Sequence, residues 1–541
     1  MPRLFARFKG LLPVLVISVP MAAVMVQRYP ASTDFPEHTL AIAVLRGLVL
    51  GEPAFVEHYT SNLSTSPYLA YHLLGAALAL LFGSAQIANR VLVVLIAIAF
   101  PLAFRKLLVA FEADRRLVWF SLMPFFSRAL SIGFLPYLFS IPVGLVLLAL
   151  AVSWSRAREP FEIRTWAARN GALAALGTLL FYSHLSSLTV FVPAALLCSA
   201  VVAPRPANAS GFSRWCLGAL SRSVWVIVPL LLALRFALVG RLSSDIDHPV
   251  TSPSYMTISR SLHALPLWIF DNFRHGWDDA AALGYWIAFT VTSVYTVVRV
   301  ARGRASFSFV RVVPLTVATL GYIVTPFQVG AAVFLNVRLA PLLLLLSLLP
   351  LRVPPTRWMT RAVGGISAFA GIVYVVSSIA CERIDASGLD AILQAIPPRA
   401  SVLSLSFERQ PHVTYVPAYL YFGSLRASET GGLVAFSFAS LPHWSIRYRA
   451  PQPKHRPFWV FSPCGFRNSA DGRLYDFVIV RGKTDPFVDE PAGPQYSLKA
   501  QSGLFALYER HRELPEWEGP DNGPCPHHSP STPMLEGEGY K

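Results

Sequence analysis

Long apolar runs recur along the first 380 residues, from Leu11 to Ala380. Each run is close to the roughly 20 residues that cross a hydrocarbon core of about 30 Å. After Cys381, Pro, Tyr, Asp and Glu become frequent, and no later run is long enough to span. We therefore predict an α-helical polytopic membrane domain of residues 1–380, with about 11–13 transmembrane helices. A smaller extracytoplasmic α/β domain of residues 381–515 follows.

The region after residue 381 contains short β-rich runs bounded by Pro, Gly and Asp, which predict strands. Residues 413–423 are compatible with a helix or a loop. The last segment, 516–541, is rich in proline and predicted to be disordered. The predicted strands are Ala400–Phe407, Trp459–Ser462, Tyr475–Arg481 and Leu504–Tyr508.

Composition supports a membrane protein. Of the 541 residues, 54% are hydrophobic and only 14% are charged, against about 25% charged in soluble proteins. The net charge of +16 does not indicate nucleic-acid binding, because the basic residues are scattered through short loops without an aromatic-rich groove. The five cysteines and the histidines lack zinc-site spacing, so we assign no residue as a metal ligand.

Clusters of Arg and Lys set the expected topology, since such loops stay in the cytoplasm. We therefore expect an integral plasma (inner) membrane protein. Its N-terminus is cytoplasmic, its C-terminal domain is extracytoplasmic, and its outer loops are residues 28–66 and 240–279. The clusters are Arg3/Arg7/Lys9, Arg105/Lys106/Arg115/Arg116, Arg156/Arg158/Arg164/Arg169, Arg205/Arg214/Arg222, Arg299/Arg302/Arg304/Arg311 and Arg352/Arg357/Arg361.

This topology needs an odd number of crossings, whereas about twelve apolar segments are present. Segment 67–82 has outer flanks on both sides and contains Tyr68, Tyr71 and His72. We expect it to lie in the outer interface or to be re-entrant. A wrongly assigned short hairpin elsewhere would restore the parity equally well.

The first outer loop carries titratable residues in the segment S-T-D-F-P-E-H, residues 32–38. On a helix, Asp34, Glu37 and His38 share one face. Asp34 is also suited to an N-cap, with Glu37 at capping-box spacing. Three possible ligands in five residues recur by chance, so the cofactor stays unknown, with a divalent cation as the weak candidate.

Several cations fall at the outer ends of predicted spans, where an unpaired charge is costly. A single arginine of this kind snorkels to the interface, but several on one face favour an anionic ligand. Arginine suits phosphate because its planar fork binds two oxygens at once. In loop 240–279, Trp and Asp residues fit either sugar contact or an interfacial aromatic belt. The four arginines are Arg90, Arg128, Arg235 and Arg338.

The plan resembles the GT-C class of integral-membrane glycosyltransferases, which includes the protein O-mannosyltransferases and the aminoarabinose transferase of lipid A. The likeness rests on D-x-x-E-H after the first span, and on three further segments. In many relatives the acids are adjacent or two prolines are paired, whereas here the acids are three apart and Pro67 stands alone. Which acid is the base therefore stays open. The further segments are S-P-Y-L-A-Y-H-L-L-G (66–75), F-G-S-A-Q-I-A-N-R (82–90) and N-V-R-L-A-P-L (336–342).

The resemblance implies transfer of a sugar from a polyprenyl-phosphate donor to an extracytoplasmic acceptor, which is a cell-envelope glycan, a lipid or a protein. It implies Asp34 as general base, with Glu37 as the next catalytic candidate. Membrane lipids, donor and acceptor are the expected partners. Two alternatives remain: a transporter or flippase of lipid-linked glycans, although no internal repeat is visible, and a non-catalytic envelope-assembly protein. The substrate-binding candidates are His38, Tyr71, His72, Arg90, His184 and Arg338.

Overall fold

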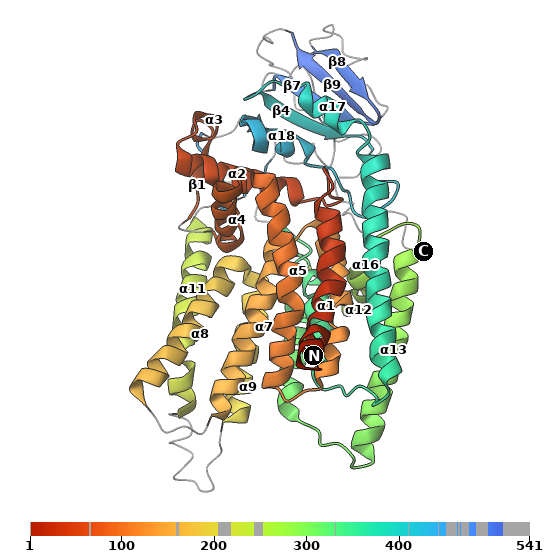
Figure 1. Ribbon diagram of the computed structural model, residues 1–541. Coiled ribbons are helices and arrows are strands. Elements are labelled where there is room, and N and C mark those ends of the chain that lie inside the picture. The colour runs from red at the N-terminus through yellow and green to blue at the C-terminus, as the bar shows by residue number, and fades with distance from the viewer. Residues whose placement is uncertain are drawn as a thin grey trace.

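The protein is a long bundle of helices with a small sheet region at one end (Figure 1). A computed structural model describes residues 2–63, 66–157, 162–203, 218–242, 253–329, 332–408, 411–435, 437–441, 443–450, 463, 466, 475–482 and 496–511. The helices come from the apolar runs and the sheet from residues after 400.

Six helical segments in the described part of the chain are long and apolar enough to cross a membrane, which indicates a membrane protein. Four shorter apolar helices accompany them. The predicted 11–13 crossings remain a prediction, because short helices do not by themselves show a crossing. The six segments are α5 (Ala85–Ala110), α7 (Leu135–Arg156), α9 (Leu185–Val202), the segment Gly218–Val239 that leads into α11 (Ile227–Leu242), α13 (Trp277–Ala301) and α16 (Arg357–Asp385).

The remaining helices of the bundle fill the space between these segments. Pro2–Met25 forms α1, whose apolar part packs against α5 and α16. The other helices are α8 (Ile163–Ser183), α12 (Ile258–Phe270), α14 (Val313–Val324) and α15 (Ala340–Ser347). Helix α12 lies inside predicted outer loop 240–279, whose residues 243–252 are outside the described residues.

Helix α4 (Leu69–Phe82) has 14 residues, and at a rise of 1.5 Å per residue it measures about 21 Å. That length is short of the hydrocarbon thickness and fits the interfacial or re-entrant helix expected for residues 67–82, whose topology stays a prediction. In Figure 1, α4 lies under α2 (Phe35–Leu50), at the end of the bundle nearest the sheet. Helix α2 is buried over most of its length between α4, α5 and α18 (Phe422–Thr430).

The sheet has the order β5-β4-β7-β9-β8. Its first three strands are parallel to one another, and the fourth strand in this order runs antiparallel to both of its neighbours. The short helix α17 (Leu389–Gln394) packs on β8 and β9. The strands are β4 (Ser401–Ser406), β5 (Leu433–Val434), β7 (Phe477–Arg481), β8 (Tyr496–Ser502) and β9 (Phe505–Arg510).

Three predicted strands are therefore confirmed, as β4, β7 and β9. The strand predicted at 459–462 and the tail 516–541 lie outside the described residues. Residues 413–421 are irregular, and α18 begins at Phe422. Strand β8 was not predicted because its sequence, Y-S-L-K-A-Q-S, is mostly polar, as befits an edge strand with several exposed side chains.

Three links hold the first outer loop and the end of α16 to the sheet region, which we define as residues 386–511. Strand β1 (Tyr59–Ser61) pairs antiparallel with β6 (Ile446–Tyr448). The Tyr29 hydroxyl donates to Asp390 over 3.0 Å. The fully buried Arg481 forms an ion pair with Asp385 at 3.1 Å. The sheet region is thereby fixed directly above α2.

Candidate functional site

Asp34 lies at the N-cap position of α2, where its side chain makes no capping hydrogen bond. Its backbone N–H donates to the carbonyl of Ile132 over 2.8 Å, and this hydrogen bond fixes the backbone of the loop. Within the described chain, the half-buried carboxylate itself has no hydrogen bond and no ion pair. The acid is thus held by its backbone while its side chain stays available.

Gly133 makes this position possible. Its φ of +94° is a left-handed conformation that residues with a Cβ rarely adopt. A Cβ at Gly133 would lie 2.5 Å from the Ser32 hydroxyl and 3.1 Å from the Asp34 nitrogen. The close approach of these two segments therefore requires glycine.

The pKa of Asp34 is raised to about 8, mainly because the carboxyl is buried; the positive charge of Arg338 lowers this pKa, and the neighbouring Glu37 raises it. A carboxyl with such a pKa takes up and releases a proton near neutral pH. That range is the one in which a general base works best.

Arg338 is the cation of this site. It belongs to the turn Val337–Leu339 before α15, and its guanidinium lies 4.0 Å from the centre of the Phe134 ring. One terminal nitrogen donates to the carbonyl of Val333 over 3.0 Å, and the other lies 3.4 Å from His184 Nε2. The buried Nε has no hydrogen-bond partner among the described residues. Arg338 thus keeps donor capacity beside Asp34.

Aromatic and hydroxyl groups complete the surroundings of Arg338. The ring of Tyr68 lies 4.9 Å from that of His184 and 5.3 Å from that of His443, centre to centre. The Tyr137 ring lies 5.1 Å from His184, and its buried hydroxyl has no hydrogen-bond partner in the described structure. These groups offer several donors to a polar ligand.

His38 and His72 form a buried hydrogen-bonded chain below the loop. His38 Nε2 is 3.0 Å from the carbonyl of Gly133, so this nitrogen donates. His38 Nδ1 is 2.9 Å from His72 Nε2, and His72 Nδ1 is 2.8 Å from the Ser445 hydroxyl. Burial lowers the pKa of His38 to about 3, so the ring is neutral and its Nδ1 accepts from His72. Both predicted ligands therefore hold Gly133, and through it the Asp34 loop.

Glu37 is fully hydrogen-bonded, unlike Asp34. One carboxylate oxygen accepts from the Ser424 hydroxyl of α18. The other accepts from the Ser437 hydroxyl over 2.8 Å and from the Phe438 N–H over 2.7 Å. Burial raises the pKa of Glu37 to about 7 although these bonds lower it. The side chain joins α2 to the sheet region.

Two other predicted ligands lie apart from Arg338. The Tyr71 hydroxyl donates to Asn89, whose amide donates to the Phe35 carbonyl and to Thr39, so Tyr71 braces α2. Arg90 donates to the carbonyl of Arg28 over 2.7 Å, and the nearby acids that act on it are Glu382 and Glu429. It shares no described contact with Arg338.

Arg128 and Asp278 make local contacts, whereas Arg235 is exposed. Arg128 forms an ion pair with Asp271 at 3.1 Å and lies 5.7 Å from the Trp268 ring, and Arg235 is exposed on α11. Asp278 accepts from the backbone N–H groups of Asn272 and Phe273, at the start of α13. No group of three or more His, Cys, Asp or Glu side chains with metal-binding geometry occurs among the described residues.

The structure adds residues that the sequence did not single out: Ser424, Ser437, His443 and Ser445. All lie in the sheet region, and three of them belong to irregular segments. No local pattern marks them, because they reach the site only through the docking of this region on α2.

Comparison of the chain with models of protein families, with curated proteins and with solved structures gave no match.

Proposed function

We propose that this protein is a membrane glycosyltransferase of the GT-C type, which transfers a sugar from a polyprenyl-phosphate donor to an extracytoplasmic acceptor. The observation that carries the proposal is the contrast between two acids on one turn. Glu37 has three hydrogen bonds, whereas Asp34 has none among the described residues and is adjacent to the charge of Arg338.

In the proposed reaction, an acceptor hydroxyl or amine attacks the anomeric carbon of the donor. The bond from that carbon to the phosphate oxygen breaks, and the phosphate leaves with the electron pair. The acceptor's proton passes to the Asp34 carboxylate. The raised pKa of Asp34 favours this step, since a stronger base takes the proton more readily.

Arg338 is proposed to bind the phosphate of the donor. Its Nε, which has no hydrogen-bond partner among the described residues, and its position against the Phe134 ring and His184 support this role, since a charged donor in a site with restricted water stabilises a departing anion strongly. Tyr68, Tyr137 and His184 surround the same guanidinium and are proposed to contact the donor headgroup. Arg90 has a supporting role in this proposal, because its described contacts are with the first loop and α5.

The test is release of polyprenyl phosphate by the purified full-length protein, measured with a panel of polyprenyl-phosphate hexoses and pentoses. Asp34→Asn keeps the shape of the side chain but cannot accept a proton, and we expect its rate to fall by about 10²–10⁴-fold. Asp279→Asn, at an exposed position at the start of α13, is the matched control. Near-normal release by a folded Asp34→Asn protein would refute the assignment.

A further inference from the structure

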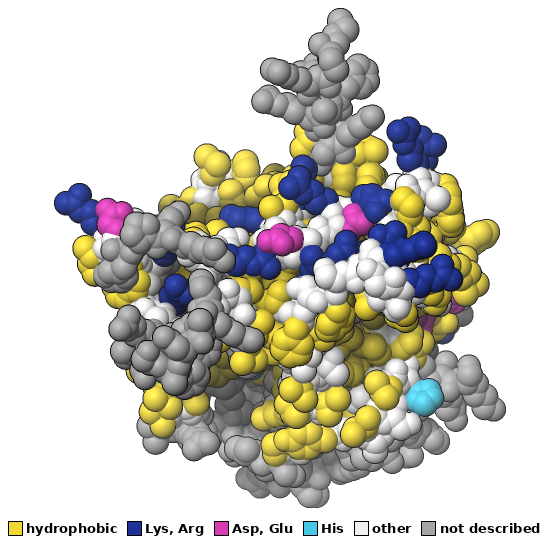
Figure 2. Space-filling model, turned by 90° about the horizontal axis from the view of Figure 1, so that it is seen from below, with side chains coloured by type: hydrophobic (Ala, Val, Ile, Leu, Met, Phe, Trp, Pro, Cys, Tyr) yellow, Lys and Arg dark blue, Asp and Glu magenta, His cyan; other side chains and the backbone are white. Residues whose placement is uncertain are grey.

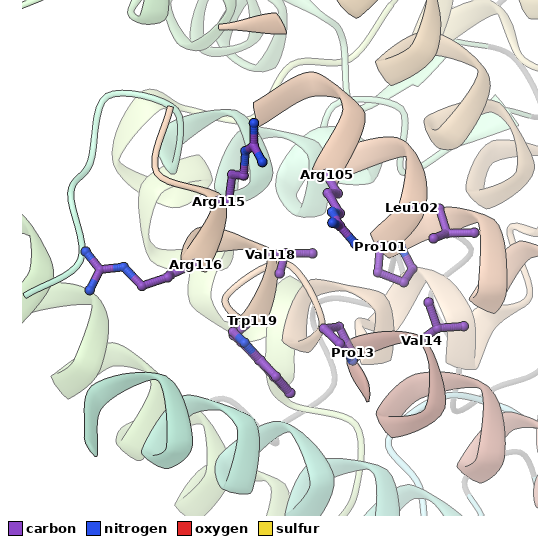
Figure 3. A pocket seen from close by; sticks show the side chains of 9 residues that line it. All are labelled: Pro13, Val14, Pro101, Leu102, Arg105, Arg115, Arg116, Val118 and Trp119. Atoms are coloured by element: carbon purple, nitrogen blue, oxygen red, sulfur yellow. The ribbon is translucent and has the colours of Figure 1, made fainter. Parts of the chain in front are cut away.

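A cavity lies at the end of the bundle opposite the sheet region, far from Asp34. Its volume is about 200 Å³. It lies between α1, α5 and the turn Arg115–Trp119, and Figure 3 shows the side chains that line it. The apolar part of the lining consists of Pro13, Val14, Pro101, Leu102, Val118 and Trp119.

Three arginines line the same cavity, and Arg116 is the one that forms an ion pair with Asp114. Arg116 binds Asp114 through two nitrogens, at 3.0 and 2.7 Å, and donates to the carbonyls of Val353 and Pro354. In Figure 3 its guanidinium points away from the other lining residues. It therefore neutralises Asp114 and fixes the turn.

Arg105 and Arg115 are different, because both are exposed. In the described structure, no hydrogen bond or ion pair engages the Arg115 guanidinium, and Figure 3 places both side chains on the same side of the cavity. Two cations thus stand at the rim of an apolar hollow. With Asp114 held by Arg116, the rim carries a net positive charge.

The position of the cavity along the bundle matches the depth of lipid headgroups. Helix α5 has 26 residues, or about 39 Å, which exceeds the hydrocarbon thickness of about 30 Å. Arg105 is five residues before the end of α5, so its charge reaches the polar interface, while the exposed Leu102 faces the hydrocarbon. Figure 2 shows that Lys and Arg side chains outnumber acids over this end of the molecule.

We propose that this cavity binds an anionic phospholipid of the adjacent leaflet, which is the cytoplasmic one in the predicted topology. An acyl chain lies against Val14, Leu102 and Trp119, and the phosphodiester accepts hydrogen bonds from Arg105 and Arg115. A free anion would make no contact with the apolar wall, and an uncharged lipid would not neutralise the positive charge of the two exposed arginines. The lining therefore suits a molecule that has both an acyl chain and a negatively charged phosphodiester. The proposal does not depend on the reaction at Asp34.

The test uses full-length protein in detergent, titrated with dioleoylphosphatidylglycerol and with dioleoylphosphatidylcholine, and native mass spectrometry to count bound lipid. We expect phosphatidylglycerol to bind more tightly, and Arg105→Gln/Arg115→Gln to weaken its binding by about tenfold or more, since each arginine near the surface contributes about fivefold. Arg302→Gln/Arg304→Gln removes the same charge from exposed positions after α13 and should retain the binding.

Location is tested separately with lipids brominated on the acyl chain. Brominated phosphatidylglycerol should quench Trp119, so the quenched fraction should fall in Trp119→Phe, and glycerol 3-phosphate should not displace the lipid. Equal binding of both lipids, equal loss in both double variants, or displacement by glycerol 3-phosphate would each overturn the proposal. If the double variant does not fold, Arg115→Gln alone, at an exposed site in a turn, provides the same comparison.

Discussion

Asp34 is expected to lower the stability of the protein in a pH-dependent way. Its carboxyl titrates with a pKa of about 8 in the folded protein, against 3.8 for the ordinary side chain. A group with a raised pKa contributes stability that is fully present below pH 3.8 and is lost as the pH rises towards 8. Asp34→Asn stays neutral throughout, so this variant should become more stable than the wild type as the pH rises.

The size of the stability difference between Asp34→Asn and the wild type, called the gap below, follows from the two pKa values. From pH 3.8 to pH 7 the interval is about 3 pH units, which at 1.36 kcal/mol per unit corresponds to about 4 kcal/mol. Because the carboxylate is half-buried, water screens part of its charge, and we expect about 2–4 kcal/mol at pH 7. The gap should widen from pH 4 to pH 8 and stay constant above that range.

Thermal unfolding in detergent between pH 4 and pH 9 measures the gap, with the fraction of monodisperse protein as readout. Asp279→Asn is the control for the loss of one carboxylate at an exposed position. A stability difference between Asp34→Asn and wild type that does not change with pH would refute the reasoning, because it would show that Asp34 is not desolvated. Lower activity together with higher stability is the pattern expected of a buried carboxylate that acts in catalysis.

Four further predictions follow from the site and the topology. Arg338→Lys keeps the charge but loses the fork, so apparent donor affinity should fall in a donor titration, and unchanged donor dependence in Arg338→Ala would remove it from the site. Glu37→Gln replaces an acceptor by a donor facing a backbone N–H, so thermal stability should drop by about 1–3 kcal/mol; an unchanged unfolding temperature would contradict the link to the sheet region. Gly133→Ala forces a Cβ against the Asp34 loop and should lower both stability and turnover, whereas a variant with wild-type values would show that the loop tolerates displacement. A cysteine at Ser84 should react with an impermeant reagent from outside the cell, and protection there, with labelling near Arg105, would overturn the topology.

The helical bundle and much of the sheet followed from sequence pattern, since apolar runs and β-branched runs are local signals. The strands β4, β7 and β9 are of this kind. The position of Asp34 before a helix with Pro36 in its first turn was also predictable. These features depend on neighbours within a few residues.

The different roles of the titratable residues in the first outer loop could not be predicted from local sequence pattern. In the sequence, Asp34 and Glu37 are two equivalent acids at the start of one helix. The hydrogen bonds from Ser424 and Ser437 to Glu37 distinguish them in the structure. Similarly, nothing near Arg90 in the sequence indicates that the carbonyl of Arg28 engages it. Such contacts join residues that are far apart in the chain, and their partners lie in segments without periodic pattern.

The contacts of Glu37 have a consequence for how the protein is made. Its partner Ser437 lies 400 residues further along the chain, and a ribosome adding about 5–20 residues per second needs roughly 20–80 seconds to reach it. During that interval the first loop has emerged, but the carboxylate of Glu37 and the strand Tyr59–Ser61 have nothing to pair with. In a nascent chain the first loop therefore lacks these partners until the last fifth of the protein is synthesised. A product truncated before β6 would never form these contacts.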